Sequence, residues 1–223
     1  MQRRNLVVAI DGPSGSGKST VARGVARALE LRYLDTGAMY RALTWLALER
    51  GIGLDAAADL QTLAEQAKLQ VVPDPAAPVI LADDVDVTAA VRSAEVTAAV
   101  SAVSAVPGVR TAMVARQRDL IGAGGIVVEG RDIGTTVAPD APVKVFLVAD
   151  PAARAERRAL QDGGESSITA TEADLTRRDT ADSTRVASPL TQAPDAVVID
   201  STQLDADAVI RRVLELVEAV IAV

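Results

Sequence analysis

The sequence has no cysteine and no histidine among its 223 residues. Without cysteine, the chain can form no disulfide and has no thiol chemistry, which fits a reducing compartment. Without histidine, it lacks the commonest general base and the commonest metal ligand. Any chemistry must therefore use carboxylates, hydroxyls, backbone N–H groups, lysine and arginine, and we expect a cytoplasmic protein.

Aromatic residues and long apolar runs are also scarce. With one Trp, one Phe and two Tyr, the core must be built mainly from Ala, Val, Leu and Ile, and a hydrophobic content of 49% is enough for a sizeable one. No run reaches the ~20 apolar residues that a membrane helix needs. The opening MQRRNLVVAIDGP has too short an apolar run for a signal peptide. We therefore expect no membrane partner.

The charges are unevenly distributed between residue types. The net charge of −7 argues against a broad nucleic-acid surface, which favours basic patches. Lysine occurs only at Lys18, Lys68 and Lys144, so 20 of the 23 basic residues are arginine. Arginine has a planar fork that binds phosphate in bidentate fashion. A general bias of composition towards Ala and Arg explains the excess equally well at this point.

Short apolar runs alternate with helical patterns along most of the chain. Strands rich in β-branched residues followed by helices are typical of a doubly wound parallel sheet, an α/β fold. A Thr-x-x-Glu/Asp pattern at Thr171–Asp174 predicts the start of one Arg-rich helix, and Asp150-Pro151 predicts the start of another. The expected strands are 6–10, 32–34, 126–130, 143–148 and 196–200, and the other expected core helices are 19–31, 38–49, 95–106, 107–121 and 205–223.

One segment departs from this alternation. After an expected helix at 56–68, the stretch LQVVPDPAAPVILADDVDVTAAV is interrupted by three prolines and has short alternating or apolar runs. Asp83-Asp84 is typical of a turn. We predict a small antiparallel sheet inserted into the α/β core. Further along, QDGGESS is expected to form a flexible loop.

The most informative motif is GPSGSGKST, which lies between the first strand and the first helix. It matches the P-loop pattern G-x-x-x-x-G-K-[ST] in the strand–loop–helix context that this pattern requires. Lys18 should reach the β- and γ-phosphates, the Ser19 hydroxyl should ligate Mg²⁺, and backbone N–H groups should surround the phosphates. The motif predicts binding of a nucleoside triphosphate. The predicted phosphate-binding residues are Gly12, Pro13, Ser14, Gly15, Ser16, Gly17, Lys18, Ser19 and Thr20.

The P-loop does not identify the acceptor of the phosphoryl group. The later lysines do not fit the N/T-K-x-D base-reading motif of GTPases, and the strand ending in VVEGRD has an arginine beside its acids, unlike a mechanical ATPase. A kinase for a small molecule and a slowly hydrolysing switch protein both remain possible. Four Arg-containing stretches, YLDTGAMYR, VRTAMVARQR, EGRDIGT and RRDTADSTR, are expected near the sheet edge where the P-loop lies. Converging arginines suit an acceptor that already bears phosphate.

Five motifs in order, IDGPSGSGKST, LDTGAMYRA, VVEGRDIGTTV, DAPVKVFL and RRDTADSTR, span nearly the whole chain. In these the sequence resembles the bacterial cytidylate kinases (CMP/dCMP kinases) of the P-loop nucleoside monophosphate kinase group. The resemblance implies transfer of phosphate from ATP to CMP or dCMP with Mg²⁺ and no nucleic-acid partner; a monomer is the default expectation. Other acceptors (UMP, AMP or a metabolite such as shikimate) and the switch protein are the alternatives. The resemblance to the cytidylate kinases also implies three parts of the chain: a core of about 1–35, 95–150 and 190–223, a region of about 36–94 that binds the nucleoside monophosphate, and a lid of about 151–189.

The resemblance also implies roles for individual residues. Thr36 and Arg41 would contact the acceptor near its phosphate, and Arg131 would hold that phosphate. Asp132 would bond to the cytosine edge. Ser101 and Arg110 would face the base, and Asp182 would contact the sugar hydroxyls. Arg178 and Arg185 would contact the sugar and the phosphates. The residues that would approach the transferring phosphoryl group are Lys18, Arg131 and the lid arginines Arg154, Arg157 and Arg158.

Ordinary structural roles are an alternative for several of these residues. Arg41 could form a surface ion pair with Glu49 or Asp35. The helix of Arg110 also has the pattern of a solvated face. Asp132 could cap the next segment, Asp182 could simply be a polar loop residue, and Glu129 could be either a structural acid or the partner of a Mg²⁺-bound water.

Overall fold

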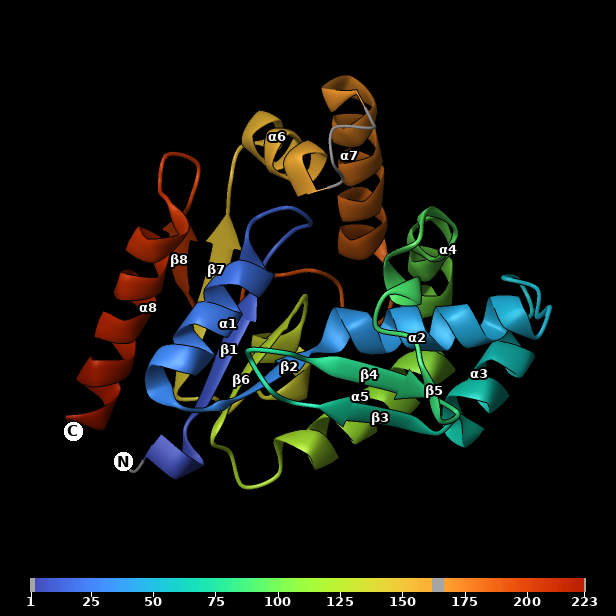
Figure 1. Cartoon of the computed structure of the whole chain (residues 1–223), viewed down its shortest axis with the longest axis horizontal. Coiled ribbons are helices and arrows are strands. Elements are labelled where there is room, and N and C mark those ends of the chain that lie inside the picture. Colours follow the sequence, from blue (N-terminus) through green and yellow to red (C-terminus); the bar gives the residue numbers. More distant parts are fainter. Residues whose placement is uncertain (1–2, 162–166, 223) are drawn as a thin grey trace.

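The computed structural model describes residues 3–161 and 167–222. Most of the expected QDGGESS loop, residues 162–166, lies outside this part of the chain. The core is a five-stranded parallel sheet in the order β2-β6-β1-β7-β8 (Figure 1). This is the expected doubly wound α/β architecture. Its strands are β1 (Val7–Asp11), β2 (Arg32–Asp35), β6 (Ile126–Gly130), β7 (Val143–Val148) and β8 (Val197–Asp200).

Helices cover both faces of this sheet. Helices α1 and α8 lie side by side on one face, and α2 to α5 cover the other (Figure 1). Helices α6 and α7 stand beyond the carboxyl ends of the strands, in the segment that the resemblance implies to be the lid. The helices are α1 (Lys18–Leu29), α2 (Thr36–Glu49), α3 (Ala57–Gln66), α4 (Ala94–Ala105), α5 (Pro107–Ile121), α6 (Pro151–Gln161), α7 (Ile168–Thr184) and α8 (Ala206–Ile221).

The alternation of side chains along the strands produces two cores. In β1, Val8 and Ile10 pack against α1 and α8, whereas Ala9 faces the core made with α2 to α5. Central strands buried on both faces explain the nearly continuous apolar runs in the sequence. Among the described residues, no single helix is long and apolar enough to cross a membrane; only α4 and α5 taken together meet that test, as a pair bent by 97°.

The predicted antiparallel insert is present as β3 (Leu69–Val72), β4 (Val79–Ala82) and β5 (Val85–Asp86). The turn between β4 and β5 lies at Asp83-Asp84, as predicted, with φ of 48° and 66°. The loop between β3 and β4 is attached to the core sheet. Its Pro73 oxygen accepts a 2.9 Å bond from the backbone N–H of Tyr33, and Arg23 of α1 donates to the oxygens of Pro75 and Ala76.

Two helices begin at least two residues earlier than we predicted from the sequence. Helix α2 begins at Thr36 because the Asp35 side chain caps it by accepting from the N–H of Ala38 at 2.9 Å. Helix α7 begins at Ile168 and not at Thr171, because Ser167 caps it by accepting from the N–H of Ala170. Either cap is possible from the local pattern, and the upstream one gives an additional helical turn with its hydrogen bonds.

Candidate active site

A cavity of about 970 Å³ is lined by residues that follow the carboxyl ends of the strands and by residues of α6 and α7. Pairing of β2, β6 and β1 places Asp35 beside Glu129 and Asp11 beside Gly130, so the loops that follow these strands meet at the carboxyl edge of the sheet. Every predicted site residue lines the cavity except Gly12, Pro13 and Arg154. Those that line it are Ser14, Gly15, Ser16, Gly17, Lys18, Ser19, Thr20, Thr36, Arg41, Ser101, Arg110, Arg131, Asp132, Arg157, Arg158, Arg178, Asp182 and Arg185.

The P-loop adopts a conformation that its first glycine makes possible. Gly12 has φ of 149°, and a Cβ atom there would lie 2.1 Å from the backbone oxygen of Leu147. The Lys18 ammonium donates to the oxygen of Pro13 at 2.6 Å and to Ser16 Oγ at 3.4 Å, so the lysine is folded over its own loop. Burial, and next the charge of Arg131, lower the pKa of Lys18. An anion in the loop would relieve both effects.

Glu129, at the end of β6, connects the P-loop to the neighbouring strand. It accepts a 3.0 Å bond from Ser19 Oγ and a second bond from the Tyr33 hydroxyl. Its side chain is buried, and burial raises the pKa of this carboxyl, followed by the charge of Asp35. Hydroxyl and carboxylate oxygens are the donors that Mg²⁺ prefers. The residues present therefore fit a magnesium ion beside the P-loop, although Glu129 also has a structural partner in Tyr33.

Arg110 and Asp132 form a buried ion pair at the wall of the cavity. Their side chains are only 3% and 6% exposed. Arg110 also donates to the oxygen of Ser104, and its guanidinium lies 5.3 Å from the centre of the Tyr40 ring. Arg110 therefore does not belong to a solvated helix face. Asp132 makes no side-chain cap bond to the segment that follows it, so that alternative is also wrong.

Thr36 and Arg41 project from the first turns of α2. Thr36 Oγ1 donates to the oxygen of Glu129 at 2.7 Å, which joins the start of α2 to the end of β6. Arg41 donates to the oxygen of Val91 at 3.1 Å and to Thr97 Oγ1 at 2.8 Å, and burial lowers its pKa to about 9. It remains protonated at neutral pH. These bonds hold Arg41 against the start of α4.

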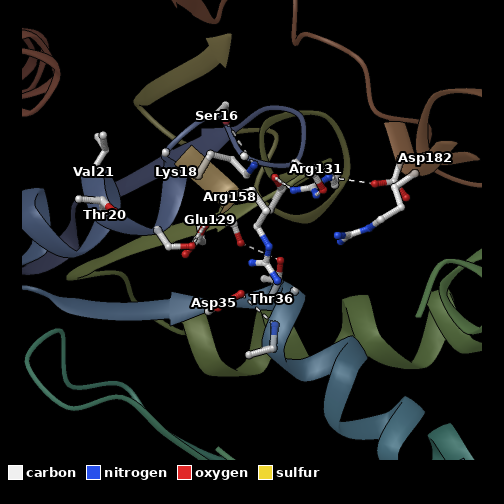
Figure 2. A pocket seen from close by; sticks show the side chains of 18 of the residues that line it. Ser16, Lys18, Thr20, Val21, Asp35, Thr36, Glu129, Arg131, Arg158 and Asp182 are labelled. Carbon is white, nitrogen blue, oxygen red and sulfur yellow. Dashed lines mark hydrogen bonds and ion pairs between the residues drawn. The ribbon is translucent and has the colours of Figure 1, made fainter. Parts of the chain in front are cut away.

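Arg131 spans the two sides of the cavity. Its Nε donates to Asp182 Oδ2 at 3.0 Å, and its Nη2 donates to Ser14 Oγ of the P-loop at 2.7 Å. Figure 2 shows Arg131 directed towards Asp182, with Lys18 and Glu129 bordering the same space. Asp182 is buried within α7, so the alternative role as a polar loop residue is wrong. The network joins the P-loop, the end of β6 and α7.

The lid arginines differ in what they contact. Arg154 donates to the oxygen of Ser14 at 3.0 Å and to the carboxylate of Asp179, and it does not line the cavity. Arg157 lines the cavity, but its guanidinium donates to Ser201 in the loop after β8. Arg178 is buried, and burial followed by the charge of Arg131 lowers its pKa.

Sequence reasoning missed several residues that shape the site. Tyr40 lies against Arg110, and Ser104 accepts from the same arginine. Asp179 accepts from the backbone N–H of Ser14 at 3.0 Å and from Arg154. Its spacing of three residues from Asp182, on one helix, could have indicated a shared face. Asp11 could have been found as the polar end of a buried strand that leads into the P-loop.

The charges of the cavity favour an anionic ligand. Arg41, Arg178 and Arg185 are each buried enough that desolvation lowers their pKa, and the charge of another arginine is the next cause in each case. Opposing carboxylates compensate only in part: Arg185 lies 3.6 Å from Asp132 and from Asp182. A ligand with phosphate groups would relieve this repulsion by pairing with the guanidinium groups.

Known proteins resemble this chain in sequence and in fold. The chain is 51% identical over 218 residues to a cytidylate kinase of Streptomyces griseus, covering 97% of this chain and 94% of the relative. It is 50% identical to one of Rhodococcus jostii, with coverage of 96% and 95%. A gluconokinase structure from Sinorhizobium meliloti shares the fold, with a TM-score of 0.50, 17% identity and coverage of 98% and 94%. The cytidylate kinase family profile matches residues 8–219. The chain therefore belongs to the cytidylate kinase family.

Proposed function

We propose that this protein transfers the γ-phosphoryl group of ATP to CMP or dCMP, giving ADP and CDP or dCDP. The observation that carries the proposal is one cavity lined both by the P-loop and by a set of buried arginines around the Arg110–Asp132 pair. The first part suits a triphosphate donor, and the second suits an acceptor with both a phosphate and a base to recognise. Membership of the cytidylate kinase family supports the choice of acceptor.

This reaction suits a chain without histidine. The attacking oxygen belongs to a phosphate that is already an anion, so no strong base has to remove a proton. The enzyme must position two phosphates and stabilise the charge of the transition state. We propose that Lys18 contacts the donor phosphates and that Arg131, Arg157 and Arg158 approach the transferring group. Arg157 would have to leave Ser201 to do so.

We propose that the residues around the Arg110–Asp132 pair bind the acceptor nucleotide. Arg41 and Thr36 contact the acceptor near its phosphate, and Arg131 holds that phosphate. Ser101, Arg110 and Asp132 select the base. The Asp132 carboxylate accepts hydrogen bonds, and the amino group of cytosine is a donor that uracil lacks, which favours CMP over UMP. The remaining contacts, to the sugar and phosphates, come from Arg178, Asp182 and Arg185.

We propose Mg²⁺ as the ion that accompanies ATP. Ser19 would ligate it through the hydroxyl, and Glu129 would hold one of its water molecules. When bound, the ion neutralises charge on the β- and γ-phosphate oxygens. To fill these roles, Ser19 would redirect the hydroxyl that now donates to Glu129. We further propose that the protein acts as a monomer in the cytoplasm, with nucleotides as its only ligands.

A coupled ADP-release assay with CMP, dCMP, UMP, AMP and no acceptor tests the proposal. We expect strong stimulation by CMP and dCMP and little by AMP. Stimulation by AMP but not CMP would refute the cytidylate assignment, and equal turnover without any acceptor would favour an NTP-hydrolysing switch protein.

The role proposed for Arg131 has a separate test. Arg131→Ala should lower phosphoryl transfer to CMP by about 10²–10³-fold, the usual effect of removing one electrostatic contact to a transition state, while ATP still binds. Arg50→Ala is a suitable control, because Arg50 is half-exposed and pairs with Asp83 in the insert, outside the cavity. Unchanged transfer in Arg131→Ala would remove Arg131 from the acceptor site.

A further inference from the structure

Asp11 is a buried carboxylate that the proposed mechanism does not use. It is the last residue of β1, immediately before the P-loop, and its exposure is 4%. A buried carboxylate is costly unless hydrogen bonds compensate for the lost water. The two oxygens of Asp11 accept from two consecutive backbone N–H groups: Oδ1 accepts from Ile133 at 2.8 Å, and Oδ2 accepts from Gly134 at 2.7 Å.

These two N–H groups begin the turn that follows the acceptor-site residues Arg131 and Asp132. The turn, η3 (Ile133–Val137), is a single π-helical turn. Its later N–H groups bond back to the chain just before it: Thr136 and Val137 both donate to the oxygen of Asp132, at 2.9 and 3.2 Å. Asp11 satisfies the first N–H groups, which have no partner within the turn. The peptide group that joins Asp132 to Ile133 is therefore held at its oxygen by the turn and at its N–H by Asp11.

The chemistry of the contact requires a carboxylate. An asparagine of the same shape has one acceptor oxygen and one N–H₂ group, so it could accept only one of the two bonds and would direct a donor at the other N–H. An alanine would leave both N–H groups buried without a partner. The sheet register adds to the constraint, because Asp11 pairs with Gly130 in the neighbouring strand.

We infer that Asp11 is a positioning residue for the acceptor: its carboxylate fixes the segment that carries Arg131 and Asp132 at a set place relative to the P-loop. The inference rests on the proposed function for the identity of the acceptor. Its physical basis is that Asp11 is joined covalently to Gly12 and by hydrogen bonds to the segment after Asp132. One side chain thus sets the relation between the donor loop and the base-binding pair. Asp11 itself need not touch either nucleotide.

Asp11→Asn tests the inference when acceptor use, turnover and ATP binding are measured separately. We expect the KM for CMP to rise at least tenfold and kcat to fall, because a displacement of about 1 Å at a reacting group can cost about 10²-fold in rate. The ratio of CMP to UMP turnover should also fall, since Asp132 and Arg110 would no longer be held in place. The Kd for ATP, measured by calorimetry without acceptor, should change less than twofold.

Asp195→Asn is the matched control. Asp195 is an exposed carboxylate that pairs at 2.6 Å with the buried Lys144, and the Lys144 side chain packs beside Gly134 on the same turn. The control removes a carboxylate near this turn and leaves the bonds of Asp11 intact. We expect it to lower the melting temperature without changing the ratio of CMP to UMP turnover.

A merely structural role for Asp11 predicts a different result. If Asp11→Asn lowers the melting temperature but leaves the KM for CMP, kcat and the CMP to UMP ratio within twofold of the native values, the inference is wrong. Hydrogen exchange gives a second measurement. The peptide covering 131–138 should exchange faster in Asp11→Asn, while peptides of β7 and α8 should not change, and unchanged exchange in 131–138 would equally refute the inference.

If Asp11→Asn does not fold, Asp11→Glu retains both oxygens and displaces them by one methylene group; it should also raise the KM for CMP with ATP affinity retained, and a native KM would overturn the inference. If the native protein shows no CMP-dependent ADP release, the proposed function fails. The kinetic comparison is then made with whichever acceptor the native protein phosphorylates, and unchanged kinetics there would overturn the inference separately.

Discussion

The buried pair of Arg110 and Asp132 allows a prediction that separates stability from function. Arg110→Met removes the positive charge and leaves Asp132 with 6% exposure of its side chain. Removing one partner of a buried pair typically costs about 3–5 kcal/mol, because the other charge remains desolvated. Arg185, 3.6 Å from Asp132, retains part of the interaction. We therefore expect a loss near the lower limit, about 3 kcal/mol in the free energy of unfolding.

The double variant Arg110→Met/Asp132→Leu should recover most of this loss. In the double variant, the introduced Met and Leu side chains fill the space between α5 and the end of β6 that the ion pair occupied. Replacing a buried ion pair by apolar side chains is often neutral in stability. We expect the double variant to unfold within about 1–2 kcal/mol of the native protein. It should nevertheless phosphorylate CMP poorly, because both groups proposed to select the base are missing.

Urea unfolding at pH 7 measures these differences. The fluorescence of Trp45, the only tryptophan, reports on α2, and far-UV circular dichroism reports on the whole chain. For a chain of this length, about 3 kcal/mol corresponds to about 6–12 °C in melting temperature. The reasoning is refuted if Arg110→Met loses less than about 1 kcal/mol, or if the double variant loses the sum of the two single losses.

Three further changes have expected outcomes. Gly12→Ala should abolish ATP binding measured by calorimetry, because its Cβ would lie 2.1 Å from the oxygen of Leu147; native affinity would contradict the P-loop geometry. Arg23→Ala removes the bonds to Pro75 and Ala76, so limited proteolysis should cleave the loop between β3 and β4 faster, and an unchanged rate would argue against this attachment. Burial raises the pKa of Asp11 from 3.8 to about 6. Between these two pH values, the Asp11 carboxyl keeps its proton in the folded state and has lost it in the unfolded state. Raising the pH from 4.5 to 7 should therefore destabilise the native protein relative to Asp11→Asn by about 2 kcal/mol, and urea unfolding at these two pH values that gives the same difference would contradict it.

The fold could be predicted from the sequence because its signals are local. Apolar runs defined the parallel strands, and three prolines with Asp83-Asp84 indicated the insert. Helix starts were less certain, because Ser167 and Thr171 both begin plausible caps and only the packed structure distinguishes them. The position of the P-loop could be predicted residue by residue, since its backbone geometry requires glycine and lysine at fixed spacing.

The partners of the site residues could not be predicted in the same way. Arg131, Ser14 and Asp182 are far apart in the sequence, and their contacts depend on how α7 lies over the strand ends. The sequence supplied no pattern that pairs Asp11 with two backbone N–H groups after β6, because backbone donors are the same at every non-proline position. Long-range contacts of this kind follow from the tertiary arrangement.

The position of Arg131 between Ser14 and Asp182 has a thermodynamic consequence. If Arg131 binds the acceptor phosphate as proposed, the phosphate competes with the Asp182 carboxylate for the same guanidinium group. Acceptor binding then shifts the equilibrium between the formed and the broken Arg131–Asp182 contact, which joins Arg131 to α7. By linkage, any ligand or variant that shifts this equilibrium must change acceptor affinity by the same factor. The lid and the acceptor site are then coupled in free energy through one side chain.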